Sequence, residues 1–145
     1  DVAPLLDELT TLFRTSHSSV MWDLHLPERL PKIALDPAAL HRALLNIFTN
    51  AAEALDTLPP EATKRVRITA VHVAAQAIIS DNGPGLQPEE RERMFEPYFS
   101  RKKGGTGLGL AIVKSIIADH RGTIRAVAAQ GGGTSIVLEF PVMRA

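Results

Sequence analysis

The sequence predicts an α+β fold: a two-layer sandwich in which helices cover one face of a mixed, largely antiparallel sheet. Three observations lead to this prediction. Stretches with helical spacing of apolar residues interleave with stretches in which apolar and polar residues alternate. Three consecutive glycines separate the last two apolar stretches, which is a hairpin signal. Neither an internal repeat nor a polar linker divides the 145 residues, so a single core is expected.

The first half of the chain is expected to form two helices and two strands. Asp36 is a suitable N-cap, and Pro37 fits the first helical position because the N–H that proline lacks would be unpaired there anyway. Trp22 and Leu24 alternate with polar residues, as in a half-buried strand. The expected elements cover residues 2–14 (helix), 19–26 (strand), 31–35 (short strand) and 37–55 (helix).

The second half is expected to form four strands and one helix around a long irregular stretch. Residues 82–106 have no clear period and are rich in glycine, proline and charge. A stretch of that length inside a compact domain is usually a functional loop or lid. The elements expected around it cover residues 65–73 (strand), 76–80 (strand), 107–120 (helix), 122–130 (strand) and 134–140 (strand).

Composition argues against several classes of function. The 16 basic and 16 acidic residues give a net charge of +0, so no nucleic-acid partner is expected. The chain has no cysteine, which excludes a disulfide framework and a thiolate metal site. No apolar run approaches the roughly 18 residues of a membrane span, and no membrane contact is expected. The first residue is Asp1, which favours a fragment of a longer protein, although an expression or processing artefact would look the same.

A polar stripe on the helix over residues 37–55 is a candidate site for a metal and phosphates. It recurs at intervals of four, four and three, through Arg42, Asn46, Asn50 and Glu53. A solvated face is the commoner reading of such a stripe. However, solvated faces usually carry Lys, Glu and Gln, and asparagine inside a helix costs up to roughly 0.7 kcal/mol relative to alanine. The carbonyl oxygen of asparagine is a suitable hard ligand for Mg²⁺ beside phosphates.

Residues 81–86 read DNGPGL and follow an apolar strand. Asp81 either caps its own turn, which is common for Asp-Asn-Gly, or accepts a hydrogen bond from a ligand. The exocyclic amine of adenine is a donor, whereas guanine carries a carbonyl there, and leaving a buried group unpaired costs roughly 1–3 kcal/mol. Gly83 and Gly85 would let the backbone approach a flat ring closely. These residues alone leave the two readings open.

Residues 104–113 read GGTGLGLAIV, so a glycine-rich stretch runs directly into a helix. Glycine lets successive N–H groups turn toward one point, and the helix N-terminus adds its positive end, which together make an anion site suited to a polyphosphate. Arg101, Lys102 and Lys103 add cationic reach. The alternative is a flexible loop before a helix, and neither the Walker spacing nor G-x-G-x-x-G after a strand is present.

Together these stretches resemble the ATP-binding domain of sensor histidine kinases, a branch of the GHKL superfamily with a Bergerat-type fold. The similarity covers roughly residues 20–141. In the family's order, LLNIFTNAAEAL resembles the N box, DNGPGL the first glycine box, MFEPYFSRKKGGTGLGL the F box and second glycine box, and GGGTSIVLEF the closing Gly-Thr. The uninterrupted FEPYFSRKKGGTGLGL is most similar to histidine kinases of the nitrogen-regulation type.

The resemblance implies a role for each matching residue. Asn50 would bind the Mg²⁺ that bridges the phosphates of ATP, and Asp81 would accept a hydrogen bond from adenine. Residues 86–105 would form a lid over the nucleotide, with Phe95 and Phe99 as its hydrophobic anchors. The other implied ATP-binding residues are Asn46, Gly83, Gly85, Lys102, Gly105, Thr106, Gly107, Leu108, Gly109 and Thr134.

Two positions of the polar stripe distinguish this chain from other members of the superfamily. Asn46 stands where ATP-hydrolysing members carry a Glu as general base, so the resemblance implies a kinase rather than an ATPase. Glu53 stands where many histidine kinases carry a phosphate-binding Lys or Arg. An acid facing polyphosphate is unfavourable, so Glu53 either points away or pairs with a cation such as Arg42.

The resemblance implies the catalytic domain of a protein histidine kinase that uses ATP and Mg²⁺. It would transfer the γ-phosphoryl group to a histidine on a dimerisation domain of the same protein, for relay to an aspartate of a response-regulator receiver domain. None of the five histidines lies in a His-Glu/Asp-x-x-x-Pro sequence, so the phosphoacceptor is expected outside this chain. Residues 19–145 would be the ATP-binding domain, and residues 1–18 a helical segment interpreted as the tail of the dimerisation hairpin.

A second function stays open from the sequence: a nucleotide-sensing or catalytically degenerate regulatory module of the same superfamily. The isolated domain is expected to be a monomer and the intact kinase a homodimer. The domain is expected in the cytoplasm, whether or not the intact protein is anchored in a membrane.

Overall fold

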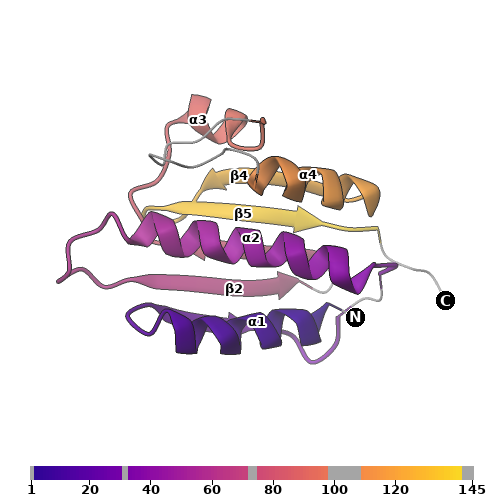
Figure 1. Ribbon diagram of the computed structural model, residues 1–145, viewed down its shortest axis with the longest axis horizontal. Helices are drawn as coiled ribbons and strands as arrows, with labels where there is room; N and C mark the ends of the chain where they lie inside the picture. Colours follow the sequence, from indigo (N-terminus) through magenta and orange to yellow (C-terminus); the bar gives the residue numbers. More distant parts are fainter. Residues whose placement is uncertain (1, 31–32, 72–74, 98–108, 142–145) are drawn as a thin grey trace.

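The computed structural model of the chain describes residues 2–30, 33–71, 75–97 and 109–141 (Figure 1). The helices along these residues are α1 (Ala3–Ser16), α2 (Pro37–Leu55), α3 (Pro88–Arg93) and α4 (Gly109–Asp119). The strands are β1 (Met21–His25), β2 (Arg65–Val71), β3 (Gln76–Asp81), β4 (Thr123–Ala128) and β5 (Thr134–Glu139).

The described strands form one mixed sheet in the order β1-β2-β3-β5-β4. β1 runs parallel to β2, and the other neighbours are antiparallel. Alternate residues point into the core, such as Val66 and Ile68 of β2 and Ile136 and Leu138 of β5. Helices α1, α2 and α4 contribute to the same core and therefore cover the same face of the sheet, as Figure 1 shows. The predicted two-layer α+β fold is confirmed.

Helix α1 shares the hydrophobic core with the sheet and with α2. Leu6 and Leu9 are fully buried, and Phe13 contacts two further aromatic rings. The ring of Trp22 in β1 lies 5.0 Å from that of Phe13 and stacks on Phe48 of α2 at 5.7 Å. Aromatic pairs of this kind contribute about 0.5–1.5 kcal/mol beyond the area they bury. The three rings join α1, β1 and α2 into one packed unit.

Helices α2 and α4 are tied together at one end. Asp36 caps α2 as the sequence predicts, because its carboxylate accepts from the N–H groups of Ala38 (3.1 Å) and Ala39 (3.3 Å). The backbone N–H of Asp36 donates to Nε2 of His120, just after α4, at 2.9 Å. Nδ1 of His120 donates to the carbonyl of Ile116 at 2.8 Å, which assigns the neutral ring with its proton on Nδ1. The end of α4 therefore lies beside the start of α2.

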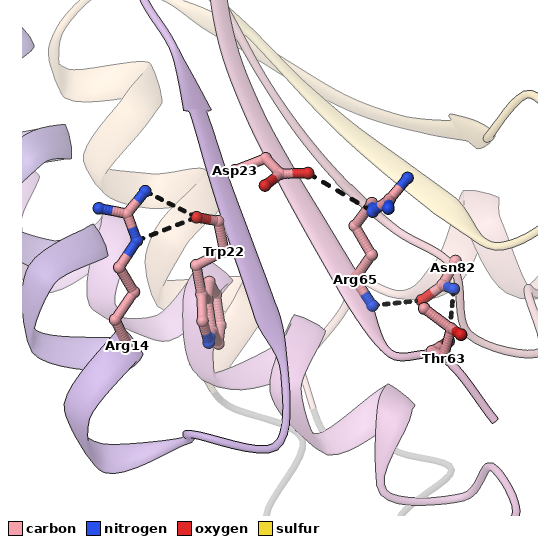
Figure 2. A network of polar contacts seen from close by, with 6 residues as sticks. All are labelled: Arg14, Trp22, Asp23, Thr63, Arg65 and Asn82. Carbon is pink, nitrogen blue, oxygen red and sulfur yellow. Dashed lines mark hydrogen bonds and ion pairs between the residues drawn. The ribbon is translucent and has the colours of Figure 1, made fainter. Parts of the chain in front are cut away.

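The strand expected over residues 31–35 is not found in its described part: residues 33–36 are irregular, although Ile33 is buried, and residues 31 and 32 lie outside the described residues. The edge of β1 explains the difference. The N–H of Met21 donates to the carbonyl of Lys64 beside β2, so the carbonyl of the next residue, Trp22, points to the outer edge. Arg14 donates to this oxygen from Nε (3.1 Å) and Nη2 (2.8 Å), as Figure 2 shows. A side chain, rather than a further strand, caps the edge there.

Helix α3 lies within the stretch that was expected to be irregular. Its first turn is stabilised by a capping box, in which Gln87 and Glu90 satisfy each other's backbone N–H groups. The following residues Met94 and Phe95 are buried in the core, so this short helix is fixed to the domain through its C-terminal side.

Candidate functional site

Asp81 is the last residue of β3 and points to the side of the sheet that the helices cover. Its neighbour in the register of β2 is the core residue Val66, and Asp81 is 7% exposed. The backbone N–H of Gly83 donates to Oδ1 of Asp81 at 2.9 Å. Burial raises the pKa of Asp81, while hydrogen bonds from the backbone N–H groups of Gly83 and Thr134 lower it in part. The site thus holds a buried acceptor with few donors of its own.

Glycines leave room around this carboxylate. A Cβ on Gly83 would lie 3.0 Å from Oδ1 of Asp81 and 3.3 Å from the carbonyl oxygen of Ala54 in α2. Gly85 has a φ of +78° and packs against the backbone of Gly133 in the turn between β4 and β5. Gly133 has a φ of +93°, and a Cβ there would overlap the carbonyl oxygen of Asp81. The turn after β3 and the turn before β5 therefore meet at Asp81.

Two predicted site residues, Asn46 and Asn50, lie on α2. This helix contacts the start of α4 near Asn46 and the turn after β3 near Ala54. Asn46 and Asn50 are half-buried and one turn apart. Nδ2 of Asn46 donates to the carbonyl of Arg42 at 3.1 Å, and its Oδ1 would be 3.5 Å from a Cβ on Gly109, the first residue of α4. Asn46 therefore faces the start of α4.

Together these contacts define an elongated site along α2. Asn46 meets Gly109 at one end, and Ala54 meets Gly83 at the other. Asn46 and Ala54 are eight positions apart, which corresponds to about 12 Å along the helix. An elongated ligand with a hydrogen-bond donor at one end and an anion at the other matches this arrangement.

The structure brings together part of the predicted site. Asp81 is surrounded by the predicted residues Gly83, Gly85 and Thr134. Asn46 lies against Gly109. Phe95, a predicted lid anchor, is buried in the core. Asn50 lies one turn from Asn46 on α2. The other predicted site residues lie outside the described residues: Phe99, Lys102, Gly105, Thr106, Gly107 and Leu108.

The described residues contain no group of three or more His, Cys, Asp or Glu side chains that could hold a metal by themselves. A metal held by Asn50 would need its other ligands from elsewhere. Phosphate oxygens and water are such ligands, and Mg²⁺ bound beside phosphates usually takes one or two protein ligands.

Two residues that surround Asp81 were not singled out as site residues from the sequence. Gly133 appeared only as part of a hairpin signal, and a contact with the carbonyl of Asp81 depends on β5 lying beside β3. Asn82 appeared only as a turn residue, yet its side chain bonds to the backbone of Thr63 and Arg65. Both roles depend on which strands are neighbours, which a local motif does not reveal.

The chain belongs to the family of histidine kinase-, DNA gyrase B- and HSP90-like ATPases, whose sequence pattern matches residues 35–144. It is an ATP-binding catalytic domain of the kind found in two-component histidine kinases. Nitrogen regulation protein NtrY of Azorhizobium caulinodans is 38% identical over 128 residues, covering 86% of this chain and 16% of that protein. The sensory histidine kinase/phosphatase NtrB of Vibrio alginolyticus is 34% identical over 139 residues, covering 89% of this chain and 39% of that protein.

Solved structures show the same fold. The mycobacterial sensor histidine kinase MprB is 32% identical with a TM-score of 0.80, and the match covers 100% of this chain and 97% of that one. The catalytic domain of histidine kinase ThkA has a TM-score of 0.83 over 99% of this chain and 95% of that one, at 24% identity, which bears on the fold alone.

The chain spans well under half the length of the curated relatives it matches, between 16% of NtrY and 39% of NtrB. Among the described residues, no helix combines the length and the hydropathy that crossing a membrane requires.

Proposed function

We propose that this domain binds Mg²⁺·ATP and, in the intact protein, phosphorylates a histidine on a dimerisation domain. The imidazole nitrogen attacks the γ-phosphorus while the bond from that phosphorus to the bridging oxygen breaks, so that ADP leaves and phosphohistidine forms. A response-regulator receiver domain then accepts the phosphoryl group on an aspartate. The intact protein would be a homodimer with this domain in the cytoplasm, and the isolated domain a monomer.

Asp81 is the observation that supports nucleotide binding most directly. It is a buried carboxylate whose surroundings supply backbone donors but leave acceptor capacity, and glycines keep the space beside it free of side chains. The exocyclic amine of adenine would complete its hydrogen bonds, whereas the carbonyl of guanine would oppose it. The residues present fit the adenine end of ATP.

The other residues of the site, apart from Thr134, are assigned to the phosphate end. Asn50 would hold Mg²⁺ through its amide oxygen, and the start of α4 at Gly109 would face the phosphates. Thr134 would hydrogen-bond near the base. The remaining phosphate contacts are assigned to Lys102 and to residues 105–108. Positioning and charge neutralisation are what a protein contributes to phosphoryl transfer.

Asn46 favours transfer to a protein over hydrolysis. Its amide already donates to the carbonyl of Arg42, and an amide cannot take a proton from water at neutral pH. The site therefore offers no general base at the position next to the start of α4. The attacking nitrogen of a neutral imidazole carries no proton, so such a nucleophile does not need a general base.

A transfer experiment in trans tests the proposal. The chain is mixed with a separately produced dimerisation hairpin from a nitrogen-regulation kinase and with ATP labelled at the γ-phosphate. We expect acid-labile label on the hairpin with the native chain and none with Asp81→Asn. ATP binding without any transfer would instead favour a nucleotide-sensing module. Steady release of phosphate by the chain alone would indicate an ATPase.

A further inference from the structure

Asn82 bonds through its side chain to the chain segment just before β2. Its Oδ1 accepts from the backbone N–H of Arg65 at 2.7 Å, and its Nδ2 donates to the carbonyl oxygen of Thr63 at 2.8 Å. Its own backbone N–H donates to the carbonyl of Arg65 at 3.2 Å. Figure 2 shows the amide of Asn82 between these backbone groups, with the side chain of Arg65 directed away toward Asp23.

This amide takes the place of main chain in the pairing of β2 with β3. The last pair in register joins Val66 to Asp81, so the next antiparallel pair would be Arg65 with Asn82. In a regular pair of this type the two residues exchange both N–H···O bonds. Asn82 makes one of them with its backbone N–H, and its Oδ1 replaces its backbone carbonyl in the other. The amide also donates to the carbonyl of Thr63, whose partner in a continued register would be Pro84, which has no N–H to donate.

The replacement lets the main chain leave the sheet directly after Asp81. If the backbone carbonyl of Asn82 had to accept from the N–H of Arg65, Asn82 would stay in the strand and carry Gly83 away from the carboxylate. Instead the chain turns, and the N–H of Gly83 reaches Oδ1 of Asp81 at 2.9 Å. The two bonds of the Asn82 side chain thus hold the start of the turn that orients this carboxylate.

We infer that Asn82 is a positioning residue of the nucleotide pocket, which fixes the turn at Gly83 and thereby sharpens the discrimination between adenine and guanine. The inference rests on the proposed function, in which Asp81 accepts from the adenine amine. A role in sheet stability alone would lower the free energy of unfolding and leave the ratio of ATP to GTP affinity unchanged.

Two variants and one control test the inference on the full chain. Asn82→Ala removes both side-chain bonds. Asn82→Asp keeps an acceptor for Arg65 but turns an oxygen toward the carbonyl of Thr63. Gln76→Ala is the control, because it removes a side-chain hydrogen bond to Glu139 (2.9 Å) at the far end of the same strand. Calorimetry gives the dissociation constants for Mg²⁺·ATP and Mg²⁺·GTP, and chemical denaturation gives the stability of each variant.

We expect both Asn82 variants to weaken ATP binding about tenfold, the loss expected when one well-aligned hydrogen bond is disturbed. GTP binding should change less, because its base does not use the carboxylate, so the ratio of ATP to GTP affinity should fall. Gln76→Ala should keep this ratio. Asn82 variants that are destabilised as much as Gln76→Ala but keep the native ratio would overturn the inference.

Hydrogen exchange separates this inference from the proposed function. In the nucleotide-free chain, the amide of Gly83 should exchange about tenfold faster in Asn82→Ala than in the native protein, because the turn that holds this N–H against Oδ1 of Asp81 is no longer fixed. Gln76→Ala should leave it unchanged. If the native chain binds no ATP, the proposed function fails while this exchange still decides the role of Asn82. An unchanged Gly83 rate in both Asn82 variants would contradict the positioning role.

Discussion

Asp81 shows how one residue can lower stability and, under the proposed function, serve as a binding group at the same time. Burial disfavours its charged form, and the backbone N–H groups of Gly83 and Thr134 offset this only in part, so its pKa is raised. The same carboxylate keeps acceptor capacity for a donor that arrives with the ligand. A side chain that served the fold alone would not need to be an acid here.

Asp81→Asn is expected to raise the dissociation constant for Mg²⁺·ATP at least tenfold. The amide would turn either an N–H₂ donor toward the adenine amine or a weaker, uncharged acceptor, and a hydrogen bond to a charged group contributes about 1.5–3 kcal/mol. Isothermal calorimetry measures the constant, and circular dichroism controls for the fold. An unchanged affinity in a folded variant would mean that adenine does not contact this residue.

The same substitution should make the domain more stable at neutral pH. Because the folded pKa is raised above the ordinary value of 3.8, the folded state binds a proton at this carboxyl more readily than the unfolded state does. Stability is therefore lost as the pH rises from about 3.8 through the raised folded pKa, and asparagine escapes this loss. Urea unfolding at several pH values should show an advantage for Asp81→Asn that shrinks as the pH falls. An advantage that is independent of pH would contradict a raised folded-state pKa of Asp81.

Asn50→Ala is expected to remove the dependence of ATP binding on Mg²⁺. If the amide oxygen of Asn50 is the protein ligand of the metal, ATP should bind to the variant about equally with and without Mg²⁺. Titrations in Mg²⁺ and in a chelator measure the difference. The neighbouring variant Asn46→Ala serves as the control, because Asn46 bonds to its own helix and should leave a Mg²⁺ effect in place.

At the scale of elements, the sequence was sufficient to predict where an element begins when the capping residues are part of that element's own sequence. Asp36 and Pro37 fixed the start of α2, and both are found in the expected roles. The prediction of a short strand over residues 31–35 was wrong for its described residues 33–35, because strand formation there depends on a partner strand and Arg14 caps the available edge of β1. The roles of Asn82 and Gly133 could not be predicted for a related reason: each acts on a strand that is distant in sequence.

Alanine at two glycines of the turn between β4 and β5 should affect ATP binding differently. Gly131 and Gly133 both have positive φ angles, so alanine costs roughly 1–2 kcal/mol at either position. Among the described residues, nothing lies within 4 Å of a Cβ on Gly131, whereas a Cβ on Gly133 would overlap the backbone of Asp81. Gly133→Ala should therefore lose ATP affinity in addition to stability, and Gly131→Ala should lose stability only.

Calorimetric titration together with urea unfolding distinguishes the two variants. Equal ATP affinities for Gly131→Ala and Gly133→Ala would show that contact between this turn and Asp81 does not matter for binding.

At the scale of the molecule, the domain has one face covered by helices and an opposite face formed by the sheet, on which polar side chains lie beside exposed Met21, Val71 and Val127. On the sheet surface opposite the helices, the hydroxyls of Ser80 and Ser135 lie 2.6 Å apart, and Arg125 pairs with Glu139 at 2.8 Å. Such cross-strand pairs contribute little each, but they make the surface compatible with water. Within the described residues, all three long helices lie on the other face, so the candidate site has the helix layer as one wall and the end of the sheet as another.

Nucleotide binding should stabilise the whole domain. A ligand present at 100 times its dissociation constant and bound only to the folded state adds about 2.7 kcal/mol. Trp22 is the single tryptophan of the chain and is packed between Phe13 and Phe48, so its fluorescence reports on unfolding of the core. Thermal unfolding followed at this residue should shift upward by several degrees with Mg²⁺·ATP, and much less for Asp81→Asn at the same concentration.

The aromatic junction of Phe13, Trp22 and Phe48 also sets a rule for protein engineering. A chimera that grafts a different sensor onto this domain at residue 19 would delete one of the three rings and expose the other two to solvent. A fusion point upstream of Ala3 would keep all three rings in the chimera.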